Sequence, residues 1–227
     1  MGKEVLEQLK GGLIVSCQAL ETEPLYSSYI MGRMAYAAME GGAVGIRANT
    51  PQDIKEIKSV VSLPVIGLYK AVSEGSEVYI TPTMKEIDAL MEVGPEIIAL
   101  DATDRVRPDG LTIQEFFPKV RAKYPDMLFM ADCSCFEDAQ RAEKLGFDLA
   151  GTTLCGYTKE TAGTQIPSYE LLRRMSAELS IPVIAEGGIW ERAQLKEAFT
   201  CGIHAAVVGT AITRPRDITK RFVEAIQ

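Results

Sequence analysis

The sequence predicts an α/β protein, a single (β/α)8 TIM barrel formed by residues 1–227. Short apolar runs bounded by turn residues alternate eight times with segments of helical period. The starts of these runs are 21 to 33 residues apart by subtraction of their numbers. Such spacing is typical of one strand and one helix in a barrel of about 250 residues. The length of 227 residues therefore suits one such domain.

The eight expected strands are short and almost wholly apolar, as strands are when a parallel sheet is buried on both faces. Their expected bounds are 13–18, 43–48, 64–70, 96–102, 127–133, 149–154, 182–188 and 205–211.

The eight expected helices follow these strands and have apolar residues at helical spacing. Their expected bounds are 30–39, 52–61, 84–93, 113–124, 136–145, 169–179, 192–201 and 216–226. Residues with hydroxyl groups that can accept from first-turn amides predict three helix starts, at Thr50 before Pro51, at Thr83 and at Ser134. Glycines that tolerate positive φ predict the ends, at Gly41-Gly42, Gly94, Gly146 and Gly202.

An open, doubly wound sheet is the alternative arrangement of eight parallel strands, and that fold usually binds dinucleotides. It predicts a GxGxxG run after an early strand, and the sequence contains none. No Pro-rich or Ser-rich linker divides the chain. The closed barrel is therefore the preferred fold.

Composition and charge exclude several classes of protein. The formal net charge is −7 and no segment gathers Lys and Arg into a patch, so nucleic-acid binding is not expected. The longest apolar runs are shorter than the roughly 18 residues that a membrane helix needs, and residues 1–10 lack the apolar centre of a secretion signal. The five cysteines are scattered and form no CxxC pair, which fits a reducing compartment. We expect a cytoplasmic protein without a membrane partner.

The active site of a TIM barrel lies at the carboxyl ends of the strands, so the last residues of each run are the candidates for chemistry. These are Gln18, Arg47, Lys70, Asp101, Asp132, Thr152, Thr153, Glu186, Gly209 and Thr210. A single charged residue at a strand end is most simply a rim salt bridge. Four of them, at Arg47, Lys70, Asp132 and Glu186, converge on one mouth, and this favours a functional site.

Lys70 and Glu186 end the third and seventh expected strands, which are four apart in a ring of eight. They should therefore face each other across the mouth with room for a sugar between them. Lys70 can act as a general base if burial and Arg47 lower its pKa from about 10.4 toward 7. It can also attack a carbonyl group and form a Schiff base.

Glycine-rich turns after the seventh and eighth strands predict a phosphate site. Gly187 and Gly188 follow Glu186, and Gly209 and Thr210 begin a turn that reaches Arg214. Barrel turns often need glycine for backbone reasons alone. Two such turns with an arginine nearby nevertheless favour anion binding, because a guanidinium can donate two hydrogen bonds to a phosphate.

The only histidine, His204, precedes the eighth strand and should lie at the opposite end of the barrel from the mouth. A Ser-His-Asp triad and a His-based metal site are therefore not expected. We expect no metal ion at the site and no cofactor.

Several runs of residues resemble one family, the bacterial N-acetylmannosamine-6-phosphate 2-epimerases, over nearly the whole chain. The runs are Ser16-Cys17-Gln18-Ala19-Leu20, Met31-Gly32-Arg33-Met34-Ala35, Ile46-Arg47-Ala48, Tyr79-Ile80-Thr81-Pro82-Thr83-Met84-Lys85-Glu86, Leu100-Asp101-Ala102-Thr103 and Gly209-Thr210-Ala211-Ile212-Thr213-Arg214-Pro215. Residues 155–167 fit no motif of this family.

The resemblance implies interconversion of N-acetylmannosamine 6-phosphate and N-acetylglucosamine 6-phosphate in sialic acid breakdown, without metal or redox cofactor. It implies Lys70 and Glu186 as catalytic residues and Gln18, Arg47 and Asp132 as sugar-binding residues. Thr153, at the end of the sixth expected strand, is a further candidate for sugar binding. It implies a phosphate site at Gly187, Gly188, Gly209, Thr210 and Arg214. The partners implied are a phosphorylated N-acetylhexosamine and a second copy of the chain in a homodimer.

Two other functions remain open from the sequence. One is a Schiff-base sugar-phosphate aldolase that uses Lys70, and the other is a sugar-phosphate binder without catalysis. The loops 71–82 and 155–167 exceed the usual two to six residues of such connections. They are candidates for a lid over the substrate or for passive surface.

Overall fold

The computed structural model describes residues 2–227 and contains a closed barrel of eight parallel strands in chain order. The predicted fold is confirmed. The strands are β1 (Leu13–Cys17), β2 (Gly45–Asn49), β3 (Val65–Leu68), β4 (Ile97–Asp101), β5 (Leu128–Asp132), β6 (Leu149–Gly151), β7 (Val183–Glu186) and β8 (Ala205–Val208).

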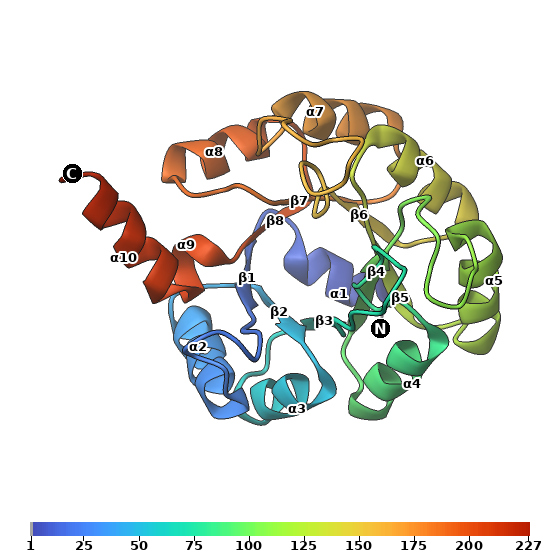
Figure 1. Cartoon of the computed structure of the whole chain (residues 1–227), viewed down its shortest axis with the longest axis horizontal. Helices are drawn as coiled ribbons and strands as arrows, with labels where there is room; N and C mark the ends of the chain where they lie inside the picture. Colours follow the sequence, from blue (N-terminus) through green and yellow to red (C-terminus); the bar gives the residue numbers. More distant parts are fainter. Residues whose placement is uncertain (1) are drawn as a thin grey trace.

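Helices surround the barrel as an outer ring (Figure 1). Within residues 2–227 the helices are α1 (Gly2–Leu9), α2 (Ser28–Glu40), α3 (Pro51–Val60), α4 (Met84–Val93), α5 (Ile113–Lys123), α6 (Phe136–Leu145), α7 (Tyr169–Glu178), α8 (Arg192–Thr200), α9 (Thr210–Thr213) and α10 (Pro215–Glu224). Helices α2 to α8 form the ring.

The helices of the expected set all form, and the bounds of α4 and α6 are those predicted. Every strand is shorter than the apolar run that predicted it. Strand β8 ends at Val208, because Gly209 adopts φ −111° and ψ −88° and the chain then turns into α9. Ala211 is therefore helical and does not belong to a strand.

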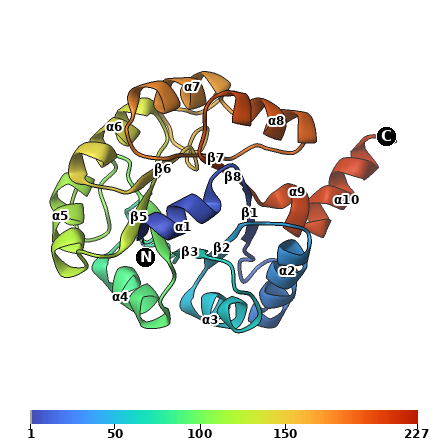
Figure 2. The same cartoon turned by 180° about the vertical axis from the view of Figure 1, so that it is seen from behind.

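Helix α1 is an element that the sequence did not predict, and it lies across one end of the barrel (Figure 2). Leu9 is fully buried, and Val5 and Leu6 pack against the apolar side chains inside the barrel. A Cβ atom at Gly45 would lie 2.6 Å from Leu9 Cδ2, so glycine there makes room for the helix. The ring of His204 contacts the carbonyl oxygen of Leu6 at 2.7 Å, which places it at this end and away from the mouth, as predicted.

The local helix signals are borne out at most positions. Thr50 precedes Pro51 and caps α3, and Thr83 forms a capping box with Glu86 at the start of α4. Ser134 was wrong as a helix start, since Cys135 is the capping residue of α6. The Ser134 amide and hydroxyl both donate to Asp138 Oδ2 instead. Positive φ is present at Gly42, Gly94, Gly146 and Gly202, whereas Gly41 is right-handed.

The apolar core has two layers, one inside the barrel and one between the barrel and the helices. Side chains of a strand point alternately to its two faces. Ile66 and Leu68 of β3 point inward, and so do Ile97 and Ala99 of β4, whereas Ile98 of β4 belongs to the outer layer. Counting on by two from Leu68 gives Lys70. The same count brings Met130 to Asp132 and Ile184 to Glu186, so these polar residues continue the inward-facing rows at the mouth.

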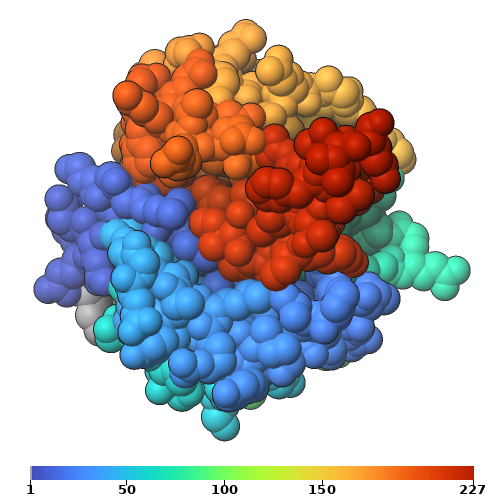
Figure 3. Space-filling model, turned by 90° about the vertical axis from the view of Figure 1, so that its left-hand side faces the viewer, coloured from blue at the N-terminus to red at the C-terminus, as the bar shows by residue number. Residues whose placement is uncertain are grey.

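Helix α10 departs from the ring and projects outward (Figures 1 and 2). None of its residues is buried, and Figure 3 shows it with α9 between the segments of α8 and α2. Two of its arginines meet the rest of the chain. Arg216 pairs with Glu23 at 3.4 Å, and Arg221 pairs with Glu191 at 2.6 Å and lies over the ring of Trp190.

Candidate active site

A cavity of about 860 Å³, here called the main cavity, opens at the carboxyl ends of the strands. Among the residues predicted to be catalytic, sugar-binding or phosphate-binding, all but one line it. They are Gln18, Arg47, Lys70, Thr153, Glu186, Gly187, Gly188, Gly209, Thr210 and Arg214. The exception is Asp132, which is 0% exposed and lies behind Arg47. The structure therefore brings Lys70 and Glu186, from opposite sides of the ring, to one space.

Arg47 is the centre of the charged network, although it is only 1% exposed. Its guanidinium donates to both carboxylate oxygens of Asp132, at 3.0 and 2.7 Å, and to Glu186 Oε2 at 2.7 Å. Burial alone would lower the pKa of Arg47, but the two carboxylates outweigh burial and raise it. The group is therefore a permanent positive charge beside the main cavity.

Glu186 ends β7, and its backbone and its side chain are both held. The Thr152 hydroxyl contacts the carbonyl oxygen and the amide of Glu186 at 2.9 and 3.1 Å. Burial raises the pKa of the Glu186 carboxyl to about 7, with Asp132 acting in the same direction and Arg47 opposing it. The carboxyl can thus gain or lose a proton near neutral pH.

Lys70 follows β3, and its amide donates to Asn49 Oδ1 at 2.8 Å. Lys70 lines the main cavity, and its ammonium group makes no hydrogen bond or ion pair with another of residues 2–227. Burial and the positive charges of Arg47 and Arg214 lower the pKa of Lys70 to about 8, while Glu186 and Asp132 oppose this. An amine of this pKa is partly neutral at neutral pH and can accept a proton or attack a carbonyl group.

Asp132 and Thr153 hold the side chains of Arg47 and Glu186 in place. The Thr153 hydroxyl lies 2.6 Å from Asp132 Oδ1 and 3.2 Å from Glu186 Oε2. Asp132 is fully occupied by Arg47 and Thr153, so it reaches the main cavity only through them. Asp101, another strand-end candidate, is 0% exposed, pairs with Arg105 at 2.6 Å and does not line the cavity.

The glycine turns lie at the β7 and β8 side of the main cavity. Gly187 and Gly188 have φ of 102° and 71°, a region that other residues rarely adopt. The amides of Gly187, Gly188, Gly209 and Thr210 make no hydrogen bond to another backbone atom within residues 2–227. Four amide donors and Arg214 therefore line one side of the cavity, an arrangement that suits an anion.

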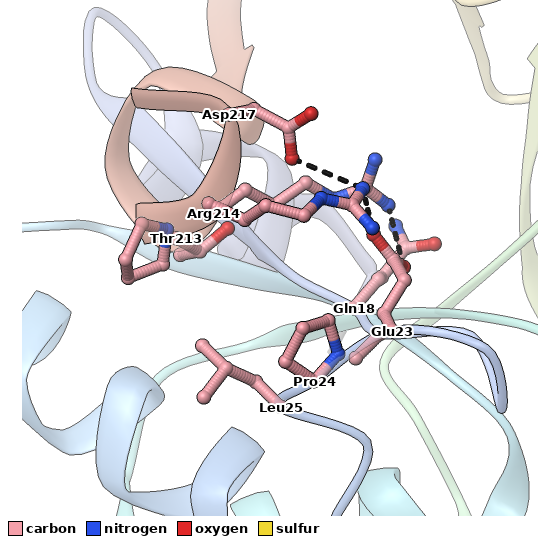
Figure 4. Close-up of a pocket in the computed structure, with 10 residues that line it drawn as sticks. Gln18, Glu23, Pro24, Leu25, Thr213, Arg214 and Asp217 are labelled. Carbon is pink, nitrogen blue, oxygen red and sulfur yellow. Dashed lines mark hydrogen bonds and ion pairs between the residues drawn. The ribbon is translucent and has the colours of Figure 1, made fainter. Parts of the chain in front are cut away.

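A smaller side cavity of about 130 Å³ lies next to the main cavity (Figure 4). Gln18, Thr213 and Arg214 line both cavities and so form the partition between them. Glu23 lines only the side cavity, and it accepts from Arg214 Nη2 at 3.2 Å and from Arg216 Nη2 at 3.4 Å. Gln18 donates to the Ser16 hydroxyl at 2.8 Å, and its Oε1 has no partner within the described residues.

Some residues of the main cavity could not be predicted from strand ends because they lie away from them. Tyr79 comes from the loop after β3, and Trp190 comes from the loop before α8. Gln194 belongs to α8 and Arg221 to α10. Burial raises the pKa of the Tyr79 hydroxyl, and the carboxylates of Asp132 and Asp101 raise it further. The run that begins at Tyr79 resembles a motif of the epimerase family, and this is the only signal for it in the sequence.

The two long loops after β3 and β6 both reach the main cavity, through Val72 and Tyr79 and through Tyr157 and Ile166. An ion pair of 2.7 Å between Lys159 Nζ and Glu77 Oε1 joins them. Within residues 2–227 no group of three or more His, Cys, Asp or Glu side chains is arranged to hold a metal ion. No helix in that part of the chain has the length and apolar character that crossing a membrane requires.

Solved structures with a similar backbone support the barrel and the family. The N-acetylmannosamine-6-phosphate 2-epimerase from Clostridium perfringens is 51% identical, with a TM-score of 0.92 over 97% of this chain and 95% of that chain. A thiamine phosphate pyrophosphorylase from Pyrococcus furiosus has a TM-score of 0.66 at 19% identity and covers 98% of each chain, which shows the fold alone.

Curated relatives match over nearly their full length. One from Enterobacter sp. (strain 638) is 56% identical over 99% of this chain and 97% of its own length. Another, from Caldanaerobacter subterraneus subsp. tengcongensis, is 52% identical over 100% of this chain and 96% of its own length. Both are described as "Putative N-acetylmannosamine-6-phosphate 2-epimerase". A family model described as "Putative N-acetylmannosamine-6-phosphate epimerase" matches residues 31–227. By this match and these identities, the chain belongs to the N-acetylmannosamine-6-phosphate epimerase family.

Proposed function

We propose that this chain interconverts N-acetylmannosamine 6-phosphate and N-acetylglucosamine 6-phosphate without a metal ion or cofactor. The observation that carries the proposal is that Lys70 and Glu186 line one cavity and have pKa values near neutrality, about 8 and about 7. Membership of the epimerase family supports the choice of substrate. Sialic acid breakdown is the process in which such an activity would serve.

The chemistry follows from the open-chain sugar, in which C2 lies next to the C1 aldehyde. The neutral Lys70 amine takes the C2 proton and becomes an ammonium group, and the C2–H electron pair moves into an enolate that carries its negative charge on the C1 oxygen. Arg47 stabilises the charge that develops on oxygen, because it is fixed beside the cavity and cannot lose its own charge. Return of a proton to the other face of C2 inverts that centre alone.

Glu186 serves the oxygen atoms in this proposal. Its carboxyl opens the sugar ring and exchanges protons at the oxygens, since burial keeps a large share of it protonated near neutral pH. Gln18, Thr153 and Arg47 hold the sugar, and Asp132 acts by holding Arg47 and Thr153. The phosphate lies at the amides of Gly187, Gly188, Gly209 and Thr210 and beside Arg214.

The test is a proton NMR spectrum of N-acetylmannosamine 6-phosphate incubated with the protein in heavy water. Epimerisation gives N-acetylglucosamine 6-phosphate with deuterium at C2. A binder without catalysis exchanges nothing, so an unchanged spectrum rules the proposal out.

Lys70→Ala should lower kcat by about 10³-fold, within the usual range for loss of a general base, while the phosphorylated sugar still binds. Lys85→Ala removes an exposed lysine of α4 and is the matched control. Normal turnover of bound sugar by the Lys70 variant would count against the assignment.

A Schiff-base aldolase is the second candidate, because an unpaired lysine of lowered pKa is also a good nucleophile. Treatment with borohydride in the presence of the sugar phosphate separates the two. An aldolase leaves a reduced adduct on Lys70 that mass spectrometry detects, whereas the epimerase leaves the mass unchanged.

A cytoplasmic location is part of the proposal. All five cysteines are free thiols, and Cys17, Cys133, Cys155 and Cys201 are buried. Free thiols are typical of proteins in a reducing compartment.

A further inference from the structure

Glu23 lies outside the main cavity, yet it contacts a residue that lines it. It belongs to the loop between β1 and α2, and its side chain is only 10% exposed. Its Oε2 accepts from the Leu20 amide at 2.8 Å and from Arg214 Nη2 at 3.2 Å, and its Oε1 accepts from Arg216 Nη2 at 3.4 Å. One carboxylate thus joins its own loop to the turn at the start of α10 (Figure 4).

The ion pair with Glu23 holds the side chain of Arg214 in place. Its side chain is 30% exposed and lines both cavities, and Glu23 is its only ion-pair partner within residues 2–227. An arginine side chain has several rotatable bonds. If it is unrestrained before a ligand binds, its ordering on binding costs conformational entropy and weakens the affinity. A fixed carboxylate on the side away from the main cavity removes most of that freedom before the ligand arrives.

We propose that Glu23 is a positioning residue that holds Arg214 toward the phosphate group of the substrate. The proposal rests on the phosphate site of the proposed function. Glu23 lines only the side cavity, so it acts on the ligand through Arg214. Its effect should therefore appear in the affinity for phosphorylated ligands and leave the chemical step at C2 unchanged.

The first test compares the kinetics of Glu23→Ala with those of the wild type on N-acetylmannosamine 6-phosphate. The KM should rise about tenfold, which corresponds to about 1.4 kcal/mol, while kcat stays within about twofold. Glu23→Gln keeps one acceptor oxygen and should raise KM by less. Glu21→Ala, which removes an exposed glutamate of the same loop, is the control and should leave both constants unchanged.

A double-mutant cycle separates positioning from a structural role in the loop. If Glu23 acts through Arg214, Glu23→Ala has no further effect in an Arg214→Ala protein, because the residue it positions is gone. If Glu23 only anchors its loop through the Leu20 amide, its effect on KM persists in that protein, and the proposal is overturned. An unchanged KM in the single Glu23→Ala variant overturns it as well.

The failure of the proposed function gives a different result. A wild-type protein that exchanges no C2 proton in heavy water refutes the epimerase proposal and leaves Glu23 to be judged by binding. Calorimetric titration with inorganic phosphate then replaces KM in the same cycle. Weaker phosphate binding by Glu23→Ala, absent in the Arg214→Ala background, supports positioning, and equal binding by the wild type and Glu23→Ala rejects it.

Discussion

At the scale of single residues, Lys70 and Glu186 determine how the rate should depend on pH. The amine accepts a proton only when it is neutral, so the rate should rise with pH toward the Lys70 pKa of about 8. The carboxyl donates a proton only when it is protonated, so the rate should fall as pH passes the Glu186 pKa of about 7. The profile of kcat/KM against pH should be a bell with its maximum between these two values.

Rates measured from pH 5.5 to pH 10 check this profile. Glu186→Gln removes the titrating acid, so the residual activity of that variant should lack the falling limb. A flat profile in the wild type, or a maximum below pH 6, contradicts the assignment of these two groups.

Asp132 makes a second residue-scale prediction, and it concerns stability. Removing its carboxylate in Asp132→Ala leaves the Arg47 guanidinium buried with Glu186 as its remaining ion-pair partner. Breaking a buried pair in this way costs about 3–5 kcal/mol. The free energy of unfolding, measured by urea denaturation, should fall by about that amount. Asp126→Ala, an exposed change in the turn before β5, is the control, and equal midpoints for the two variants would contradict the prediction.

At the scale of elements, Gly188 shows how the turn after β7 depends on the loop after β6. A Cβ atom at Gly188 would lie 2.6 to 2.8 Å from side-chain and backbone atoms of Ile166. Gly188→Ala should therefore push the glycine turn away from its position and raise KM for the phosphorylated sugar. Gly163 has a similar φ of 82°, and a Cβ atom there would meet no other atom within 4 Å, so Gly163→Ala tests the backbone strain alone.

The comparison of these two alanine variants gives the contribution of the Ile166 contact. Ile166→Ala in the Gly188→Ala protein should restore part of the lost affinity, because it removes the contact with the Cγ1 atom at 2.6 Å and leaves the contacts with the Cβ atom and the backbone carbon. A KM that is equal in Gly163→Ala and Gly188→Ala would show that the contact has no role in binding.

The sequence predicted the strands and the outer helices well because each depends on local patterns. Apolar runs, alternation by two and residues such as Thr83 and Gly94 are visible in the chain itself. It did not predict α1, because that helix precedes the first strand and so stands outside the repeat of strand and helix, although Val5, Leu6 and Leu9 are at helical spacing. The sequence also placed the start of α6 at Ser134, one residue before the capping residue Cys135, because a serine hydroxyl is the usual capping group and a cysteine is not.

The candidate site was predictable as far as strand ends define it. Lys70, Glu186 and Arg47 were found because polar residues stand at the inward-facing ends of apolar strands. Asp132 has the same pattern, and only its contacts show that Arg47 covers it. Tyr79 and Glu23 come from loops, where no periodicity indicates which way a side chain points.

At the scale of the whole molecule, α10 presents an apolar surface that nothing in residues 2–227 covers. Phe222 of α10 is 75% exposed, Ile226 just beyond the end of the helix is 86% exposed, and no residue of the helix is buried. The homodimer implied by the family resemblance would bury such a surface. We expect light scattering after gel filtration to give twice the mass of the chain. Phe222→Asp should shift the mass toward that of one chain, whereas Val106→Asp, which changes an exposed residue before α5, should not. A monomeric wild type would contradict the expectation.

Helix α1 gives the barrel a closed floor, since Leu9 fills one end and the apolar residues of the strands fill the space below the charged network. A sugar can therefore enter and leave only through the opening at the carboxyl ends of the strands. The product must therefore leave the main cavity before the next substrate molecule binds. Accumulated product should act as a competitive inhibitor, because both epimers occupy the same space.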